Sequence, residues 1–490
     1  MSKHTVNREW QLLIGGEFVD GEAGTTPIGN PATEEVVGEA PEASVAQAHA
    51  AAAAAQAAFE GWRTTPAVEK ARLLDALADA LAAKQDELVP LIIAETGATV
   101  TVGSRMQVPV AIDRFRWYAK AAVRAHDIAL TPHATAATPL AAGGLINSVV
   151  KRQPVGVVAC ITPYNFPLVN MAGKIAPALA AGCTIVMKPA LQDPLAILEL
   201  AAIMHDVGFP AGVVNVVTSA DTAPAAALSE SPDVDMVSFT GSTVVGERIF
   251  AAGAPTMKRL LLELGGKGAA LIVDDADIGV AVNALASTWG FHSGQICTAP
   301  TRAVVHRSRY DELVAALAGA APHLKVGAPT DADTVVGPVI SAAQRDRIES
   351  YIQTAADEGA TVAVDGRRPS HLSSGYYVGP TLVTECEPAM TAVREEIFGP
   401  VVVVVPYDGD DAVGVAVAND SEFGLYSYVF SGDLNRAYGL AQGIRSGVVG
   451  INTAQIHPEA PFGGFKRSGV GRDRGDIGLH AYTEMQSLVW

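Results

Sequence analysis

Apolar and polar residues near the N-terminus follow helical periods. Residues 45–62 are dense in alanine, which has the highest intrinsic helix propensity, and predict one helix. Residues 68–84 predict a second helix, because its leucines from Leu73 to Leu81 fall on one face. The segment 131–147 is rich in Thr, Ala, Gly and Pro and lacks this period. We interpret it as a hairpin that leaves the body of the protein.

From Val155 onwards, short apolar runs alternate with helical segments. The runs GVVACI, TIVMK, GVVNVV and DMVSF have the character of buried strands. Between the second and third runs we expect a helix with Asp193 as its N-cap, Pro194 at its first position and Gly208 just past its end. A second series of the same kind runs over 263–476, and the chain closes on a strand-like segment, AYTEMQSLVW. The alternation predicts parallel sheets with right-handed crossovers.

Composition narrows the class of protein. A chain of 490 residues with 49% hydrophobic and 18% charged residues is globular and long enough for two or three domains. The 34 basic and 52 acidic side chains give a net charge of −18, which disfavours nucleic acid and membrane partners. The most apolar run, VVVVV, is far shorter than the roughly 20 residues of a membrane-spanning helix.

The four cysteines are few and scattered, and no C-x-x-C pair indicates zinc. We therefore expect no disulfide framework and no metal site. The sequence MSKHTVNREW lacks the apolar core of a signal peptide, so a reducing cytoplasm is the expected location. For Cys160, Cys183 and Cys386, packing in the core is the expected role.

Polar residues follow three of the predicted strands. Thr162–Pro167 follows GVVACI, Lys188 ends TIVMK, and Thr240–Gly246 follows DMVSF. Ligands of open parallel sheets bind at the carboxyl ends of the strands. The TGST turn could be an ordinary connection, but it opens a helix, and a helix N-terminus suits a pyrophosphate. Because Lys188 could reach a ribose or phosphate from the same edge, the residues together predict a dinucleotide site.

A thiol and a carboxylate with glycine neighbours complete the candidate chemistry. Glu263 precedes two glycines, and Cys297 lies in GQICT. Taken singly, they could be a solvated glutamate and a packed cysteine. Together with a dinucleotide they suit aldehyde oxidation: the thiolate adds to the aldehyde, and Asn165 with a backbone N–H stabilises the alkoxide. Hydride then passes to the nicotinamide, and Glu263 activates the water that hydrolyses the thioester.

These motifs, in this order, closely resemble those of the aldehyde dehydrogenase superfamily over essentially the whole chain. The matching segments are PYNFP at 163–167, KPA at 188–190, FTGST at 239–243, ELGGK at 263–267, GQICTAPTR at 294–302, EEIFGP at 395–400 and PFGG at 461–464, which continues to Arg472. The resemblance implies that Cys297 is the nucleophile, Glu263 the general base and Asn165 the oxyanion donor. The residues implied to bind the cofactor are Lys188, Thr162, Pro163, Gly241, Ser242, Gly265, Glu396 and Phe398, with Glu396 on the nicotinamide ribose.

The resemblance also implies an α/β protein of three parts. These are a Rossmann-like cofactor domain over 1–130 and 152–262, a catalytic domain over 263–476, and a β-hairpin oligomerisation arm over 131–151 and 477–490. A homodimer or a homotetramer is the implied assembly.

Two departures bear on cofactor and substrate. Leu191 stands where many NAD-preferring members carry a glutamate that would repel a 2′-phosphate, so either NAD or NADP is expected. Gly173 replaces a tryptophan of some members, and His292 replaces the arginine of members specific for succinic semialdehyde. A roomy pocket without a fixed cation predicts a neutral aromatic or medium-chain aldehyde, with a semialdehyde as the alternative. The predicted pocket comprises Phe166, Gly173, His292, Ile296, Thr298, Ile456, His457 and Phe462.

Three other functions are weighed against this one. CoA-acylating members typically lack the glutamate of ELGGK, whereas Glu263 is present here. Non-catalytic relatives would be expected to lose the thiol or the base. A cysteine hydrolase would need a histidine beside Cys297, and His292 is near in sequence, but that function would leave Lys188 and the TGST turn unexplained.

Overall fold

The computed structural model describes residues 9–490, so most of the N-terminal segment in which no signal peptide is predicted lies outside the described residues. A first sheet has the order β19 (Gly469–Val470), β11 (Arg259–Glu263), β10 (Met236–Thr240), β7 (Val157–Ile161), β8 (Thr184–Lys188), β9 (Val214–Val216), β1 (Leu12–Ile14) and β2 (Glu17–Val19). The five strands from β11 to β9 are parallel, as the alternation predicts, and antiparallel strands close both edges.

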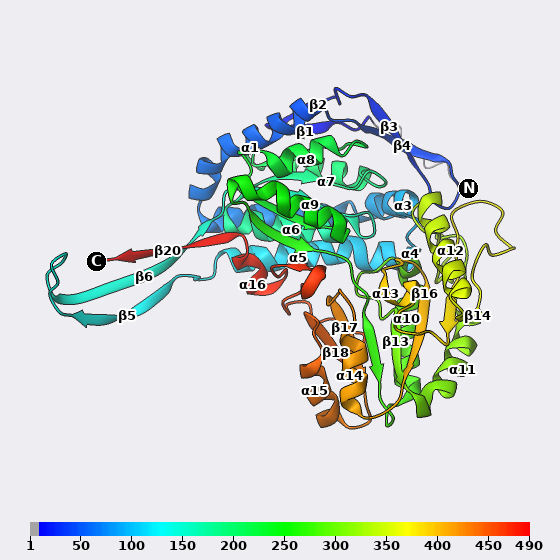
Figure 1. Cartoon of the computed structure of the whole chain (residues 1–490). Coiled ribbons are helices and arrows are strands. Elements are labelled where there is room, and N and C mark those ends of the chain that lie inside the picture. Colours follow the sequence, from blue (N-terminus) through cyan, green and yellow to red (C-terminus); the bar gives the residue numbers. More distant parts are fainter. Residues whose placement is uncertain (1–8) are drawn as a thin grey trace.

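Helices cover both faces of this sheet (Figure 1). On one face lie α1 (Val45–Thr64), α8 (Ala223–Glu230) and α9 (Thr243–Gly253), and on the other lie α2 (Ala67–Ala83), α3 (Gln85–Thr96), α5 (Val108–Ala122), α6 (Pro167–Ala181) and α7 (Leu195–Val207). The two helices predicted from the alanine and leucine patterns are therefore confirmed as α1 and α2. Side chains of β7 alternate between the two cores, with Val158 in one and Val157 in the other. This is a doubly wound α/β unit.

The start of α7 differs from the prediction. Its N-cap residue is Pro194, and the side chain of Asp193 forms no cap. Instead, the carboxylate of Glu95, at the end of α3, accepts hydrogen bonds from the backbone N–H groups of Leu195 at 2.8 Å and Ala196 at 3.0 Å. Asp193 is fully buried, and within residues 9–490 its carboxylate has no hydrogen-bond partner. A cap supplied from 100 residues away has no local sequence signal.

A second sheet has the order β14 (Thr361–Val364), β15 (Thr381–Thr384), β16 (Val401–Tyr407), β13 (Arg302–His306), β12 (Ala269–Ile272), β17 (Tyr426–Phe430) and β18 (Val448–Ile451). All neighbours are parallel except β14 with β15. The VVVVV run is the buried strand β16, as expected. The larger helices on this sheet are α10 (Ile278–Gly290), α11 (Tyr310–Ala320), α12 (Ala342–Asp357), α14 (Asp411–Asn419) and α15 (Leu434–Gly443).

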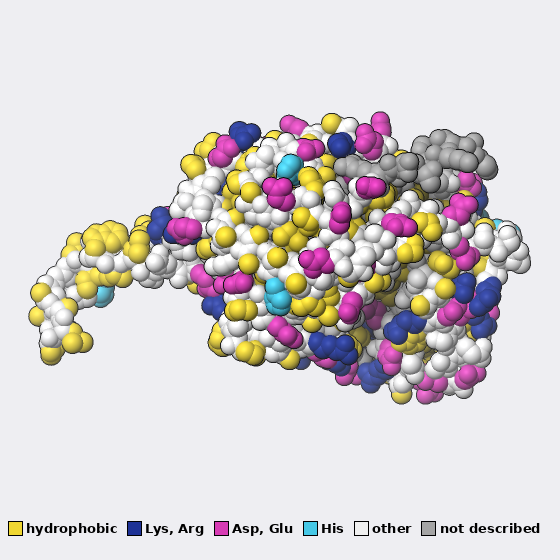
Figure 2. Space-filling model, turned by 90° about the horizontal axis from the view of Figure 1, so that it is seen from above, with side chains coloured by type: hydrophobic (Ala, Val, Ile, Leu, Met, Phe, Trp, Pro, Cys, Tyr) yellow, Lys and Arg dark blue, Asp and Glu magenta, His cyan; other side chains and the backbone are white. Residues whose placement is uncertain are grey.

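The remaining strands form two small sheets. β3 (Thr25–Gly29) pairs with β4 (Val36–Pro41). The predicted hairpin is present as β5 (Ile128–Thr135) and β6 (Gly144–Pro154), and the terminal segment, β20 (Thr483–Val489), pairs with β6. These three strands project from the body as an arm (Figure 1), and the arm shows many apolar side chains (Figure 2), among them Leu140, which is 97% exposed.

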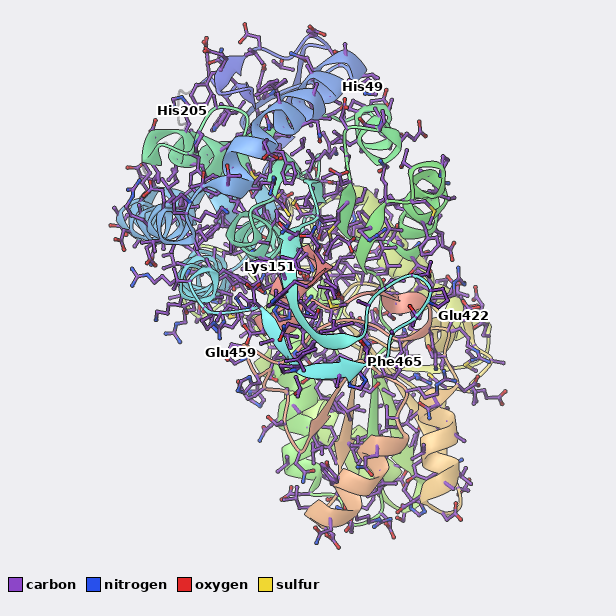
Figure 3. The ribbon with its side chains drawn as sticks, turned by 90° about the vertical axis from the view of Figure 1, so that its left-hand side faces the viewer. His49, Lys151, His205, Glu422, Glu459 and Phe465 are labelled. Atoms are coloured by element: carbon purple, nitrogen blue, oxygen red, sulfur yellow. The ribbon has the colours of Figure 1, made fainter. Side chains whose placement is uncertain are left out.

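The arm leaves the body on the side where α1 lies (Figure 1). In Figure 3, which looks along the arm, Lys151 lies on the hairpin near the middle of the molecule, and His49 of α1 and His205 of α7 lie toward the top of the view. No helix among the described residues is both long and apolar enough to cross a membrane.

Candidate active site

The two large sheets meet end to end at the candidate site. In the first sheet, Ile161 pairs with Lys188 and Thr240 with Glu263, so the carboxyl ends of β7, β8, β10 and β11 share one edge. In the second sheet, Cys297 precedes β13, and Glu396 precedes the neighbouring β16. The carboxyl edge of one sheet therefore faces the amino edge of the other.

A cavity of about 820 Å³ lies between these edges. Of the residues predicted from sequence, those that line it are Pro163, Asn165, Phe166, Gly241, Ser242, Glu263, Gly265, Ile296, Cys297, Thr298, Glu396, Phe398, Ile456 and Phe462. Thr162, Lys188, Gly173, His292 and His457 do not line it. The three predicted catalytic residues thus come together in one cavity, although they lie far apart in the sequence.

A left-handed turn presents Cys297. After α10 the backbone takes positive φ values at His292 (47°), Ser293 (56°) and Gly294 (69°), which turns the chain back toward the first sheet. A Cβ on Gly294 would collide with the backbone at Gly399, so glycine is required there. Cys297 is half-buried, whereas Cys160, Cys183 and Cys386 are buried, as predicted.

The thiol of Cys297 has a raised pKa. Burial is the main cause, and the carboxylates of Glu396 and Glu263 add to it, so the pKa rises to about 12. The guanidinium of Arg474 acts in the opposite direction. A thiol in this state reacts only after its environment gains positive charge or a base takes its proton.

Asn165 is held in place by hydrogen bonds. Its Nδ2 donates to the carbonyl of Gln295 at 2.9 Å, and its Oδ1 accepts from the N–H of Phe166 at 3.1 Å and from Nδ2 of Asn170 at 3.2 Å. Because an amide nitrogen carries two hydrogens, one donor of Nδ2 remains beyond the bond to Gln295. The amide therefore carries a donor for a negatively charged oxygen in the cavity.

Glu263 ends β11 with its carboxylate buried. Neither carboxylate oxygen has a hydrogen-bond partner in the described part of the chain. Burial raises the pKa of Glu263 well above its ordinary value, and Asp473 adds to the rise, while Lys174, Arg472 and Arg474 oppose it. An orphaned carboxyl of this kind can exchange protons with a reacting group, because its charged form is not locked in an ion pair.

The predicted cofactor residues lie along the strand ends. Glu396 accepts a 2.8 Å hydrogen bond from the N–H of Gly266, and burial raises its pKa to about 7. Among the described residues, the buried ammonium of Lys188 donates one hydrogen bond, to the carbonyl of Ser219 at 3.4 Å, so it retains donors. The hydroxyl of Thr162 is buried without a partner within residues 9–490. Ser242 caps α9 through the N–H of Val245. These free donors at strand ends and at a helix N-terminus fit an anionic dinucleotide.

The pocket differs from the prediction in its charge. Three arginines, Arg114, Arg347 and Arg474, line the cavity together with Asp473, so the expectation of a pocket without a fixed cation is wrong. The space beside Gly173 is already occupied by Arg114 rather than left open. His292 is buried, packs against Phe166 with the rings tilted and their centroids 4.9 Å apart, and has a pKa lowered by burial to about 4. Sequence reasoning missed all three arginines, since none of them stands in a motif.

The fold is a doubly wound α/β sheet, and its strand ends face a thiol, an amide and a carboxyl group across one cavity. This arrangement is typical of the active site of an α/β enzyme. The model of the aldehyde dehydrogenase family matches residues 18–488, and the chain belongs to this family. It is 38% identical to 3-succinoylsemialdehyde-pyridine dehydrogenase of a Pseudomonas species over 482 residues, 98% of each protein. It is 36% identical to the chloroplastic betaine aldehyde dehydrogenase of Beta vulgaris over 488 residues, 98% of this chain and 96% of the relative.

Solved structures agree with the predicted fold. The betaine aldehyde dehydrogenase of Staphylococcus aureus in complex with NAD+ superposes with a TM-score of 0.93 at 36% identity, covering 99% of this chain and 95% of that one. The predicted family and aldehyde dehydrogenase fold are thereby confirmed.

Proposed function

We propose that the chain oxidises an aldehyde to a carboxylate with NAD+ or NADP+ as hydride acceptor. The observation that carries the proposal is the meeting of Cys297, Asn165 and Glu263 in one cavity beside donor groups that suit a dinucleotide. The overall reaction consumes one aldehyde, one oxidised nicotinamide and one water. It releases one carboxylate, one reduced nicotinamide and two protons.

The first half of the reaction forms a thioester on Cys297. The thiolate adds to the aldehyde carbon, and the carbonyl oxygen becomes an alkoxide, which Nδ2 of Asn165 and a backbone N–H can stabilise. When the carbonyl re-forms, the carbon loses hydride and remains bound to sulfur. Removing one oxyanion donor typically costs about 10²–10³ in rate, so Asn165 is expected to matter strongly.

The second half hydrolyses the thioester. The carboxylate of Glu263 takes a proton from water, the hydroxide adds to the thioester carbon, and the carbon–sulfur bond breaks. The acid leaves and the thiolate of Cys297 is restored. Because water is the acceptor, Glu263 favours this reaction over transfer of the acyl group to CoA or a non-catalytic role.

The chemistry that the bound cofactor would supply is a nicotinamide carbon that accepts hydride. Lys188, Thr162, the N-terminus of α9 and Glu396 are the groups we assign to holding it, and solved relatives are NAD+ complexes. Leu191 is half-buried and carries no charge, so it would not repel the 2′-phosphate of NADP, and NADP also fits. We assign the exposed apolar arm to self-association, as a homodimer or homotetramer in the cytoplasm.

Cys297→Ser and Glu263→Gln test the proposal. With an aldehyde panel and both cofactors, absorbance at 340 nm is expected to show turnover in the native enzyme and none in Cys297→Ser. Glu263→Gln is expected to keep a burst of one reduced cofactor per site and then turn over slowly, because only deacylation needs the base. Cys386→Ala removes a thiol outside the cavity and is the matched control. Undiminished turnover by Cys297→Ser would refute the mechanism.

A further inference from the structure

Three arginines line the active-site cavity, and two of them, Arg114 and Arg474, have no role in the reaction described above. The third, Arg347, donates to the hydroxyl of Tyr351 and to the carbonyl of Glu396. Arg114 extends from α5, and Arg474 directly precedes α16 (Gly475–His480). The guanidinium of Arg114 donates to the carbonyl of Val169 and fills the space beside Gly173. Within residues 9–490, neither guanidinium forms an ion pair or a side-chain hydrogen bond to a carboxylate.

Arg474 packs on an aromatic ring and has a strained backbone conformation. Its guanidinium lies over the ring of Phe462, 4.4 Å from the centroid, and has no hydrogen bond to a described residue. The backbone at Arg474 has φ 71° and ψ 155°, a region that is essentially restricted to glycine. Such strain persists where the surrounding structure enforces it, and it is concentrated at functional sites.

The charges around Arg114 and Arg474 leave both guanidiniums without a paired carboxylate among the described residues. Asp473 also lines the cavity and is the carboxylate that acts most strongly on Arg474. Burial and the neighbouring Arg474 lower the pKa of Arg114 to about 10, so Arg114 stays protonated at neutral pH. Guanidinium groups such as that of Arg474 keep their charge in proteins. Asp473 acts on both guanidiniums but forms no ion pair with either, and a partly desolvated cation is costly until an anion pairs with it.

The contacts of the arginines place them beside predicted substrate residues: Arg114 donates to the carbonyl of Val169, on the helix that follows Asn165 and Phe166, and Arg474 lies over Phe462. Arg474 influences the pKa of Cys297 and that of Glu263. The pKa of Glu396, the residue assigned to the cofactor ribose, responds instead to Lys267 and Arg347. An anion bound by Arg114 and Arg474 therefore belongs to the aldehyde, not to the cofactor phosphates.

We infer that the substrate is an aldehyde that carries one carboxylate at the end remote from the reacting carbon, and that Arg114 and Arg474 bind this carboxylate. The inference rests on the proposed function and adds the substrate class. A planar guanidinium matches a carboxylate with two parallel hydrogen bonds, and Arg114 and Arg474 both lack a carboxylate partner of this kind among the described residues. Apolar lining residues such as Ile456 and Phe462 suit the carbon chain between the two ends.

The test compares an acid with its neutral isostere. The probes are 4-oxobutanoate and 5-oxopentanoate, each against its methyl ester, assayed with saturating cofactor. The native enzyme is expected to favour the acid at least tenfold in kcat/KM. Arg114→Gln and Arg474→Gln should each lower the acid-to-ester ratio at least tenfold, whereas Arg114→Lys should retain a larger part of it. Arg116→Gln, on the same helix but exposed and paired with Asp79, is the control that should leave the ratio unchanged.

The outcomes separate the two claims. Glutarate binding to Cys297→Ser, measured by calorimetry, gives a readout without turnover and should weaken in both glutamine variants. An acid-to-ester ratio of one or less, or a ratio within twofold of native in both variants, would overturn the inference while aldehyde oxidation stood. If Arg474 served only to lower the pKa of the thiol, its loss would slow both probes equally, which also overturns the inference. Failure of the proposed function appears instead as undiminished turnover by Cys297→Ser.

Discussion

The guanidinium of Arg114 occupies the space that a side chain on Gly173 would need. A Cβ built on Gly173 would overlap Nη1 of Arg114, and the next guanidinium atom, Cζ, would be 3.3 Å away. The absence of a side chain on α6 therefore does not widen the pocket. It allows a cation from α5 to enter the cavity beside the carbonyl of Val169.

Gly173→Ala should consequently change substrate preference. The added methyl group displaces the flexible end of Arg114, so the acid-to-ester ratio in kcat/KM is expected to fall about tenfold, equivalent to about 1.4 kcal/mol. Gly439→Ala is the matched control, because a Cβ there meets no atom within 4 Å. An unchanged ratio in Gly173→Ala would show that the position of Arg114 does not determine the preference.

Arg474→Gly should separate function from stability. Relief of the strained backbone is worth about 1–3 kcal/mol, while a glycine costs about 0.5–1 kcal/mol in unfolded-state entropy. Arg474→Gln loses the same charge but keeps the strain, so the glycine variant is expected to have the higher Tm by scanning calorimetry. Both should lose carboxylate preference. A lower Tm for the glycine variant would mean that the backbone at Arg474 is not under strain.

Much of the candidate site could be predicted because its chemistry lies in short segments at strand ends. Parallel strands bring their carboxyl ends to one edge, so recognising GVVACI, TIVMK and DMVSF as strands was enough to place Asn165, Lys188 and Ser242 together. The glycine-containing turn around Cys297 predicts a reactive thiol, and hydrolysis of its thioester requires a base, for which Glu263 is the candidate carboxylate.

The charge of the pocket could not be predicted in this way. Arg114 lies on an amphipathic helix where an arginine is usually a solvated residue, and Arg474 follows the closing motif by only a few residues. Only the packing of α5 against α6, which lacks a side chain at Gly173, brings Arg114 into the cavity. The prediction of Asp193 as the N-cap of α7 was wrong for the same reason, because the carboxylate that caps the helix, that of Glu95, reaches it through tertiary structure.

Leu191→Glu should turn the enzyme away from NADP. A carboxylate at this position would repel a 2′-phosphate and could accept hydrogen bonds from ribose hydroxyls. We expect the ratio of kcat/KM for NADP to that for NAD to fall at least tenfold, and Leu191→Gln, which is uncharged, to have a smaller effect. A native enzyme that already prefers NAD by a thousandfold would refute the use of NADP.

The pH dependence of turnover should follow Glu263. Its pKa is raised by burial, so the acid form persists to higher pH than for an ordinary glutamate. Only the deprotonated form can accept a proton from water, and kcat should therefore fall as the pH drops through this raised pKa. Steady-state kcat between pH 5 and 9 measures it, and Glu263→Gln should lack this limb. The same limb in Glu263→Gln would assign it to another group.

Glu95 should make the stability of the protein depend on pH. Burial raises its pKa from 4.5 to about 8 in the folded chain. Between these values the unfolded chain has lost the proton and the folded chain still holds it, so the free energy of unfolding falls with rising pH, by about 1.4 kcal/mol per unit at most. This contribution is complete below pH 4.5 and is lost by about pH 8. Asp193, whose pKa is also raised by burial and by Glu95, acts in the same direction.

Glu95→Gln should flatten this dependence. The amide cannot ionise but keeps one oxygen for the N–H groups of Leu195 and Ala196, so at pH 5 the variant is expected to be less stable by about 1 kcal/mol, the worth of a weakened cap. Toward pH 8 the difference should shrink or reverse, as measured by denaturant unfolding across the range. Glu87→Gln, exposed on the same helix, is the control. Parallel pH curves for Glu95→Gln and the native chain would show that Glu95 is ionised throughout, with the buried cap stabilising its charge.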